Sequence, residues 1–285
     1  MRKVILFILL FGTSGCTVKT LYNQLDWLIA DHLQSYVELS DEQQHSLRLH
    51  IEQSLLWHKS SQLPLYVEWL TKFRADVISQ PEAAVLEQDL EQLQTFVRNL
   101  RIHAADELSV LLPSLSAKQR RELYAGMEKK NSEFADRFIN ISREQQLEQY
   151  IERTRDRFDE WLGSLTTEQE AMIRASAIDI KSVAGEVLKT RRRWQQEFIR
   201  ILDGQDQVVT TKQALRELFA NLDRLRSKDY QQDAHHNQQI FIGLIISVAN
   251  SMSKDQRDYF SAKVANYSRY FMELAEEARD ELKMN

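Results

Sequence analysis

The stretch Leu165-Thr166-Thr167-Glu168-Gln169 holds the pattern that decides the fold. An apolar residue is followed by a hydroxyl residue, two further positions and a glutamine. This order is typical of a capping box, in which the hydroxyl oxygen accepts a hydrogen bond from the backbone amide three residues on, and the glutamine side chain bonds the amide of the cap residue. The stretch therefore predicts that a helix begins after Thr166.

The same order occurs at three other places, which are Leu39-Ser40-Asp41-Glu42-Gln43, Leu115-Ser116-Ala117-Lys118-Gln119 and Met252-Ser253-Lys254-Asp255-Gln256. The four copies are 76, 50 and 87 residues apart, so they do not form a solenoid of fixed period. Structural capping is predicted for four hydroxyl and glutamine pairs: Ser40 and Gln43, Ser116 and Gln119, Thr166 and Gln169, and Ser253 and Gln256.

The rest of the chain has too few turn residues for a sheet protein. After Cys16 the 285-residue sequence contains five glycines and three prolines. Strand-rich proteins need frequent turns, whereas the abundant Gln, Glu, Arg, Leu and Ala are good helix formers. The prediction is an all-α bundle of long antiparallel helices without a sheet.

Apolar residues at helical spacing place the helices along the chain. The pattern predicts that Pro64 opens a helix, that Pro81 starts a long segment running to Pro113, and that residues 167–203 form one unbroken helix about 55 Å long. The other helical segments are expected at 41–59, 117–140, 143–162, 211–229, 231–250 and 254–283. Trp27 is expected in the core, with the membrane interface as the alternative.

The N-terminus reads as a secretory signal. Arg2 and Lys3 precede eight apolar residues, Val4–Phe11, and small residues lead to Cys16, the single cysteine. Eight apolar residues are too few to span a bilayer as a helix. The small residues before Cys16 resemble a bacterial lipoprotein signal, although Thr13 stands where that motif usually has leucine. An ordinary signal cleaved near Gly15 is the alternative.

This resemblance implies a signal peptide over residues 1–15, lipidation of Cys16, an anchored start over 16–20 and a helical periplasmic domain over 21–285. The domain is expected as one unit or as two packed halves, 21–163 and 164–285. Thr17 replaces the aspartate that usually retains lipoproteins at the inner membrane. The expected location is therefore the inner leaflet of the outer membrane, with the body in the periplasm.

Charge excludes a nucleic-acid partner. Loss of residues 1–15 removes two positive charges, and the formal net charge of −5 becomes −7, whereas nucleic-acid binders are usually basic. The expected partners are the membrane, through the N-terminal lipid, and envelope proteins or unfolded clients. No cofactor is expected.

Two family resemblances bear on function. The Leu-Thr-x-x-Gln pattern is similar to that of small periplasmic chaperones of the Spy and CpxP kind, which implies a client-binding role. The start Cys16-Thr17-Val18-Lys19, the Trp57-His58 and Leu63-Pro64-x-Tyr66 stretches, and the segment from Trp161 to Gln169 resemble an uncharacterised family of proteobacterial lipoproteins. That resemblance spans essentially the whole chain and implies a helical, lipid-anchored envelope protein with no catalytic residues to transfer.

Candidate chemistry is sparse. Glu42 and His45 have the spacing of half a di-iron site, but no second Glu-x-x-His pair completes it. His50 and His58 do not share a helix face with His45, and the adjacent His235 and His236 point apart on a helix. No metal site and no catalytic residues are therefore predicted, and the chain is not expected to be an enzyme.

One dense basic run, from Lys189 to Arg193, is the candidate contact for an anion or an acidic partner, through Lys189, Arg191, Arg192 and Arg193. The simpler interpretation is a solvated helix face whose charges pair with Glu186 and Glu197. Three functions remain open: a non-catalytic scaffold of the envelope, a helical chaperone, and a hydrolase whose carboxylate site is assembled from distant helices.

Overall fold

The computed structural model describes residues 22, 24–79, 81–204 and 208–284. Within these residues every regular element is a helix and there is no strand, so the all-α prediction is confirmed. The main helices are α3 (Leu25–Gln34), α4 (Asp41–Trp57), α5 (Leu63–Ile78), α6 (Ala83–Leu111), α7 (Ala117–Phe138), α8 (Arg143–Leu162), α9 (Thr167–Ile178), α10 (Ala184–Asp203), α11 (Val208–Ala220), α12 (Lys228–Asn250) and α13 (Lys254–Met284).

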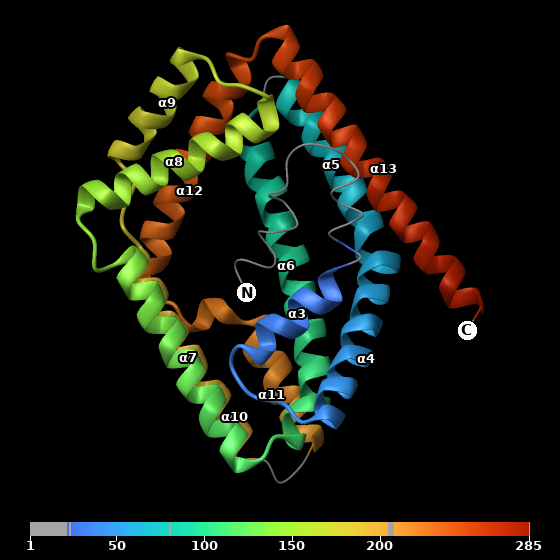
Figure 1. Ribbon diagram of the computed structural model, residues 1–285. Helices are drawn as coiled ribbons and strands as arrows, with labels where there is room; N and C mark the ends of the chain where they lie inside the picture. The colour runs from blue at the N-terminus through green and yellow to red at the C-terminus, as the bar shows by residue number, and fades with distance from the viewer. Residues whose placement is uncertain (1–21, 23, 80, 205–207, 285) are drawn as a thin grey trace.

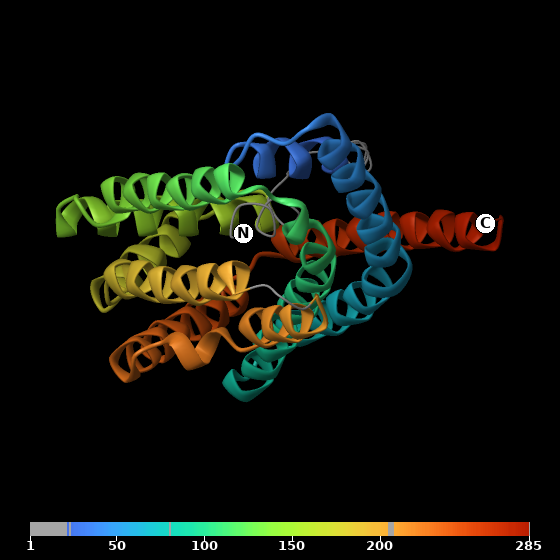
Figure 2. The ribbon, with the colours of Figure 1, turned by 90° about the horizontal axis from the view of Figure 1, so that it is seen from below.

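The helices form an elongated frame. Figure 1 shows α4, α5 and α13 along one side, α6 through the middle, and α7 and α10 on the opposite side. The helix α13 packs along α5, and α11 packs along α6. The last turns of α13 extend beyond the other helices in both views (Figures 1 and 2).

Three apolar clusters hold the frame together. The largest joins α5, α9, α12 and α13, with Leu63, Ile173, Ile242 and Leu274 almost completely buried in it. A second cluster joins α6, α10 and α11, and a third lies between α3 and α4. The largest cluster combines residues from both sides of the proposed boundary at 163. That division into halves stays a prediction.

All four expected capping boxes are present. The Ser40, Ser116 and Thr166 side chains accept from the amides of Gln43, Gln119 and Gln169 at 3.2–3.3 Å. At the start of α13 the amide of Gln256 donates to Ser253 Oγ at 3.1 Å, and the side chain of Gln256 accepts from the Ser253 amide at 3.0 Å.

The boxes are joined in pairs, which the sequence analysis did not predict. Gln43 Nε2 donates to Ser114 O at 2.8 Å, and Gln119 Nε2 donates to Gln43 Oε1 at 2.6 Å. Gln169 and Gln256 exchange amide hydrogen bonds of 3.0 and 2.8 Å in the same way. We call these two contacts the glutamine pairs. They tie the start of α4 to that of α7, and the start of α9 to that of α13.

A fifth capping box was missed. Ile141-Ser142-Arg143-Glu144-Gln145 has the same residue order, and Ser142 Oγ accepts from the Gln145 amide at 3.1 Å at the start of α8. The Gln145 side chain accepts from the Ser142 amide at 2.9 Å. Among the hydrogen bonds of the described residues, Gln145 makes none to a second box, so it caps one helix only.

The unbroken helix predicted for residues 167–203 is wrong, because α9 ends at Ile178 and α10 begins at Ala184. The backbone between them bonds to α12 instead of continuing the helix. The amide of Lys181 donates to Asn237 Oδ1 at 2.9 Å, and Asn237 Nδ2 donates to Lys181 O at 2.8 Å. His236 also contacts Asp179 O at 3.0 Å. Tertiary hydrogen bonds thus replace helical ones at these backbone groups.

Pro64 lies in the first turn of α5, as predicted, but no loop separates this helix from α4. It is the second residue of α5, which follows α4 directly through a π-helical turn, η1 (His58–Gln62). Proline cannot donate the backbone hydrogen bond that an α-helix needs at that position, and a π-turn absorbs this mismatch. Ser61 Oγ donates to Trp57 O at 2.6 Å, which satisfies a carbonyl at the turn.

Candidate functional site

The π-turn aims His58 into the interior, where it lies between two tyrosines. His58 and Tyr22 are buried, with 6% and 3% of their surfaces exposed. Tyr22 Oη bonds His58 Nδ1, and His58 Nε2 lies 3.2 Å from Tyr66 Oη. Tyr22 precedes α3, so this contact fastens the chain before its first long helix onto the junction of α4 and α5.

Burial sets the protonation of this cluster. Desolvation lowers the pKa of His58 to about 4, and the nearby His103 lowers it further. Burial raises the pKa of Tyr22 and of Tyr66. All three groups are therefore neutral at ordinary pH. A neutral imidazole has one donor and one acceptor nitrogen, so His58 can serve both hydroxyl groups.

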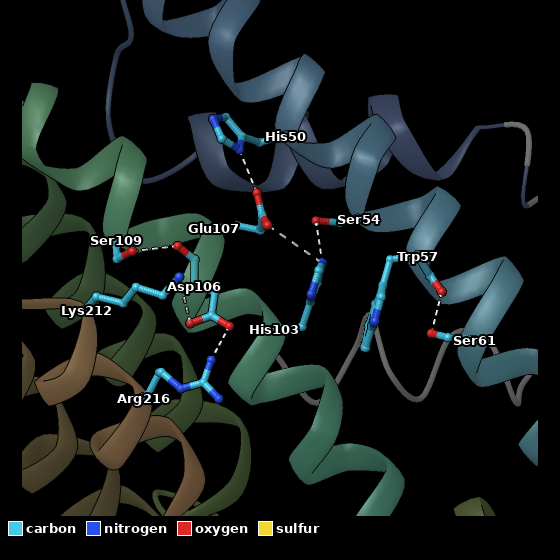
Figure 3. A network of polar contacts seen from close by, with 10 residues as sticks. All are labelled: His50, Ser54, Trp57, Ser61, His103, Asp106, Glu107, Ser109, Lys212 and Arg216. Carbon is cyan, nitrogen blue, oxygen red and sulfur yellow. Dashed lines mark hydrogen bonds and ion pairs between the residues drawn. The ribbon is translucent and has the colours of Figure 1, made fainter. Parts of the chain in front are cut away.

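A second polar network lies next to this cluster, where α4 faces α6 (Figure 3). Glu107 stands between two histidines: Oε2 is 2.6 Å from His50 Nδ1, and Oε1 is 3.9 Å from His103 Nε2. His103 Nε2 also lies 3.2 Å from Ser54 Oγ. The ring of Trp57 stacks on His103 with centroids 3.8 Å apart and an angle of 8°. Burial lowers the pKa of His103.

Ser54, His103 and Glu107 have the residue types of a hydrolytic triad without its geometry. In a triad the carboxylate orients the imidazole through one ring nitrogen while the serine bonds the other. Here Ser54 and Glu107 approach the same nitrogen, Nε2. The arrangement positions the imidazole ring but does not activate the serine.

The neighbouring turn of α6 carries an ion-pair cluster. Asp106 faces Lys212 and Arg216 of α11, with Lys212 Nζ at 3.6 Å (Figure 3). Its backbone oxygen accepts from Ser109 Oγ at 2.6 Å. The ion pairs of Asp106 with Lys212 and Arg216 join α6 to α11, and we assign them a role in holding the two helices together.

The basic run of α10 does not form one basic surface. Lys189 pairs with Glu186 at 2.7 Å, Arg192 pairs with Glu128 at 2.6 Å, and Arg193 donates to Leu225 O at 2.9 Å. The Arg191 guanidinium lies 4.7 Å from the Phe134 ring centre. The expected pairing of this run with Glu197 is wrong, because Glu197 accepts from Arg224 at 2.5 Å.

The remaining sequence candidates lie apart. His45 is exposed on α4, and His236 bonds the backbone of Asp179. The residues that the structure describes contain no group of three or more His, Cys, Asp or Glu arranged to hold a metal ion. Cys16 lies outside the described residues. Trp27 was expected in the core, but 63% of its surface is exposed, so that prediction is wrong.

Sequence reasoning missed most of the His58 cluster. Tyr22 lies 36 residues from His58, and no local spacing links them. Tyr66 follows His58 by eight residues, a spacing that could have suggested a contact between them. The π-turn changes the helical register between the two residues, so the spacing alone did not predict it. Since His103 and Glu107 lie on α6, their proximity to α4 depends entirely on packing.

A model of a family of unknown function (DUF6279) matches residues 35–231, which is more than half of the chain. This is shorter than the nearly full-length resemblance expected from the sequence. No curated protein and no solved structure matches the chain. None of the described helices has the length and hydropathy needed to cross a membrane.

Proposed function

This chain belongs to the DUF6279 family of unknown function, and we propose that it is a lipid-anchored, non-catalytic scaffold protein of the cell envelope. In this proposal Cys16 carries the lipid in the inner leaflet of the outer membrane, and the helical body lies in the periplasm. The body is held against the membrane, where it presents its surface to other envelope proteins.

The observation that carries the proposal is the burial of Tyr22, six residues after Cys16. Its hydroxyl is bonded to His58, and Lys59 Nζ lies 5.6 Å from its ring centre. Six residues span about 20 Å at full extension. Because Tyr22 is fixed in the interior, a lipid on Cys16 would keep this end of the body within that distance of the bilayer.

The exposure of Trp27 supports the same orientation. Trp27 lies on α3, five residues after Tyr22, while its neighbour Leu25 is 3% exposed. The helix is thus fixed by its buried side and presents an indole to the outside. Tryptophan is favoured at the boundary between lipid and water, because its ring is largely apolar and its N–H needs a polar partner.

The glutamine pairs support a scaffold role. Each joins two helix starts that are 76 or 87 residues apart in the chain through paired amide hydrogen bonds. The helix α13 begins near the top of Figure 1 and α4 begins in its lower part, so the pairs lie toward opposite ends of the frame. A frame fixed at both ends suits a protein that holds partners at set positions.

The anchor is tested by fractionating cells that express Cys16→Ser and Thr17→Asp variants. The first should leave the membranes for the soluble periplasmic fraction, because it cannot be lipidated. The second should stay in membranes but move from the outer to the inner membrane fraction. Retention of Cys16→Ser in the outer membrane would contradict the proposal.

The scaffold role is tested by crosslinking in intact cells from exposed positions such as Leu49 and Leu65. A scaffold should give a small set of defined adducts whose yield falls in Cys16→Ser cells. A chaperone should instead suppress aggregation of a denatured client at near-stoichiometric ratio in vitro. Such suppression, together with diffuse crosslinking, would replace the scaffold proposal by the chaperone one.

A further inference from the structure

One arginine of α6 has an unusual environment. The Nε atom of Arg101 is buried and has no hydrogen-bond partner. Its neighbours one turn away along α6 are Val97, Arg98, Ala104 and Ala105, none of which is acidic. Among the ion pairs of the described residues, none includes Arg101 or Arg98. A half-buried guanidinium thus makes no ion pair within the described residues.

The charges around Arg101 come from the next turn of α6 and from the 3-10 helix η3 (Leu222–Leu225) and its flank. Arg101 interacts electrostatically with Asp223, Arg226 and Arg98. Burial lowers the pKa of Arg101, Asp223 raises it, and Arg226 and Arg98 lower it further. Ala105 and Leu225 belong to the same apolar cluster, which holds this part of α6 beside η3.

The one carboxylate in this group is already engaged. Arg226 Nη1 lies 2.6 Å from Asp223 Oδ1, and the Arg226 guanidinium lies 5.2 Å from the Tyr230 ring centre. The charge of Asp223 is therefore balanced by Arg226. Arg98 and Arg101 make no ion pair of their own within the described residues, and the nearby Asp223 carboxylate is shared with Arg226.

The half-buried guanidinium of Arg101 costs stability in the absence of an anion. Removing a charge from water is costly unless a partner of opposite sign compensates, and like charges placed together add to that cost. The guanidinium cannot escape by losing its proton, because arginine stays protonated in proteins. A bound anion would supply the missing partner.

We propose that Arg98, Arg101 and Arg226 form a binding site for a phosphate group at the junction of α6 and η3. A phosphate monoester carries a charge of about −1.5 to −2 at neutral pH, which matches the two unpaired guanidinium groups. Arginine presents parallel N–H donors that fit phosphate oxygens in bidentate fashion. Free phosphate and the phosphate of a phosphorylated sugar share this chemistry. The site does not depend on the lipid anchor.

In the sequence the run from Lys189 to Arg193 is the densest in basic residues and was the predicted anion contact. Density was a poor guide there, since three of those side chains engage acidic groups or a backbone carbonyl. The cationic groups of the proposed site are spread over 128 residues of sequence, from Arg98 to Arg226, and none stands in a basic run.

The test is a calorimetric titration of the detergent-solubilised full chain at fixed ionic strength, with inorganic phosphate, glucose 1-phosphate and glucose. Saturable binding is expected for the two phosphates and not for glucose. Arg101→Gln and Arg98→Gln should each weaken phosphate binding at least tenfold. The matched control is Arg216→Gln, which removes a guanidinium paired with Asp106 at another part of the same interface; its affinity should equal that of the wild type.

The outcomes separate cleanly. Equal affinity for both phosphates supports a site for free phosphate, and tighter binding of glucose 1-phosphate supports a phosphorylated glycan. Absence of saturable binding by either compound would overturn the proposal, as would equal weakening in all three variants. Arg98 is exposed, so its variant leaves the core intact and decides the matter if Arg101→Gln does not fold.

Discussion

At the scale of single residues, the hydrogen bonds of the buried Tyr22–His58–Tyr66 cluster hold the segment around Tyr22 in place. Each hydroxyl and each imidazole nitrogen of His58 has a partner within the cluster. A satisfied buried hydrogen bond contributes only modestly to stability, whereas an orphaned partner costs about 1–3 kcal/mol. The cluster therefore holds Tyr22 chiefly because its removal would leave His58 unsatisfied.

Tyr22→Phe should lower the free energy of unfolding by about 1–3 kcal/mol, because it keeps the ring but leaves His58 Nδ1 without a partner. The measurement is urea denaturation followed by circular dichroism. Tyr259→Phe is the matched control, since Tyr259 is 42% exposed. Equal stability of the Tyr22 variant and the wild type would show that the hydroxyl contact does not fasten the segment.

The protonation of His58 predicts a specific loss of stability in acid. An imidazole in the unfolded chain takes up a proton below about pH 6.5, whereas burial holds the pKa of His58 at about 4 in the fold. Between these values the unfolded state binds more protons, so the free energy of unfolding falls as the pH falls. The shift corresponds to roughly 3 kcal/mol across that window.

Comparison of His58→Gln with the wild type isolates this contribution, because the other titrating groups are common to both proteins. The variant should be less stable at pH 7 and should lose less stability between pH 6.5 and pH 4. Denaturation curves at half-unit pH steps give both quantities. Parallel pH profiles for the two proteins would rule out His58 as the source of the acid sensitivity.

At the scale of helices, the capping boxes make two kinds of hydrogen bond: those within one helix start and those between two helix starts. Within one helix the box satisfies backbone amides at the first turn, which local sequence alone dictates. Between helices the glutamine amides are free to bond a second glutamine, which depends on the packing of distant segments. Gln169 is completely buried by its contact with Gln256 and Ser251, whereas Gln145 is exposed.

Gln169→Ala and Gln145→Ala separate the two kinds of hydrogen bond. Gln145→Ala keeps the Ser142 cap and removes only the bond from the Ser142 amide to the glutamine side chain, so it should cost about 0.5–1.5 kcal/mol. Gln169→Ala should cost about 2–4 kcal/mol, because it also removes the hydrogen bonds of a completely buried side chain to Gln256 and Ser251. Urea denaturation of both variants measures the difference. Similar costs for the two would mean that the glutamine pairs add nothing to single-helix capping.

Helix starts were predictable from the sequence because capping depends on neighbouring residues. Helix ends and breaks were not, because they depend on contacts with distant segments. Ser40, Ser116, Thr166 and Ser253 act within four residues, so their pattern is visible in one stretch. At the break between Ile178 and Ala184 the backbone bonds to Asn237 and His236, more than 50 residues away. The π-turn at His58 was likewise unforeseen, because Pro64 usually marks a new first turn rather than a change of helical register.

At the scale of the whole molecule, the fold class followed from composition, but the arrangement of the helices did not. Scarcity of glycine and proline excluded sheets, whereas the partners of each helix depend on which apolar faces meet. The largest core joins α5 to α13 across nearly 200 residues of sequence, and no periodicity in one segment identifies the other. The same distance hid the Arg98, Arg101 and Arg226 site.

The exposed face of α3 bears on how the whole molecule is oriented at the membrane. Trp27 in isolation is an apolar residue left on the surface, and single exposed apolar residues are common. Its position matters because Tyr22 is fixed beside it and Cys16 precedes it by eleven residues. If Cys16 carries lipid, the body approaches the bilayer through this end, with the indole of Trp27 at the interface.

Quenching of tryptophan fluorescence by brominated lipids tests this orientation most directly. The lipidated protein is reconstituted into vesicles with and without brominated acyl chains, and its incorporation is checked by flotation. We expect part of the wild-type emission to be quenched and no quenching in Trp27→Phe. In Trp161→Phe, whose indole packs in the core, the brominated chains should remove the same absolute amount of emission as in the wild type. Equal quenching of Trp27→Phe and the wild type, or no quenching of either, would contradict a body held against the membrane.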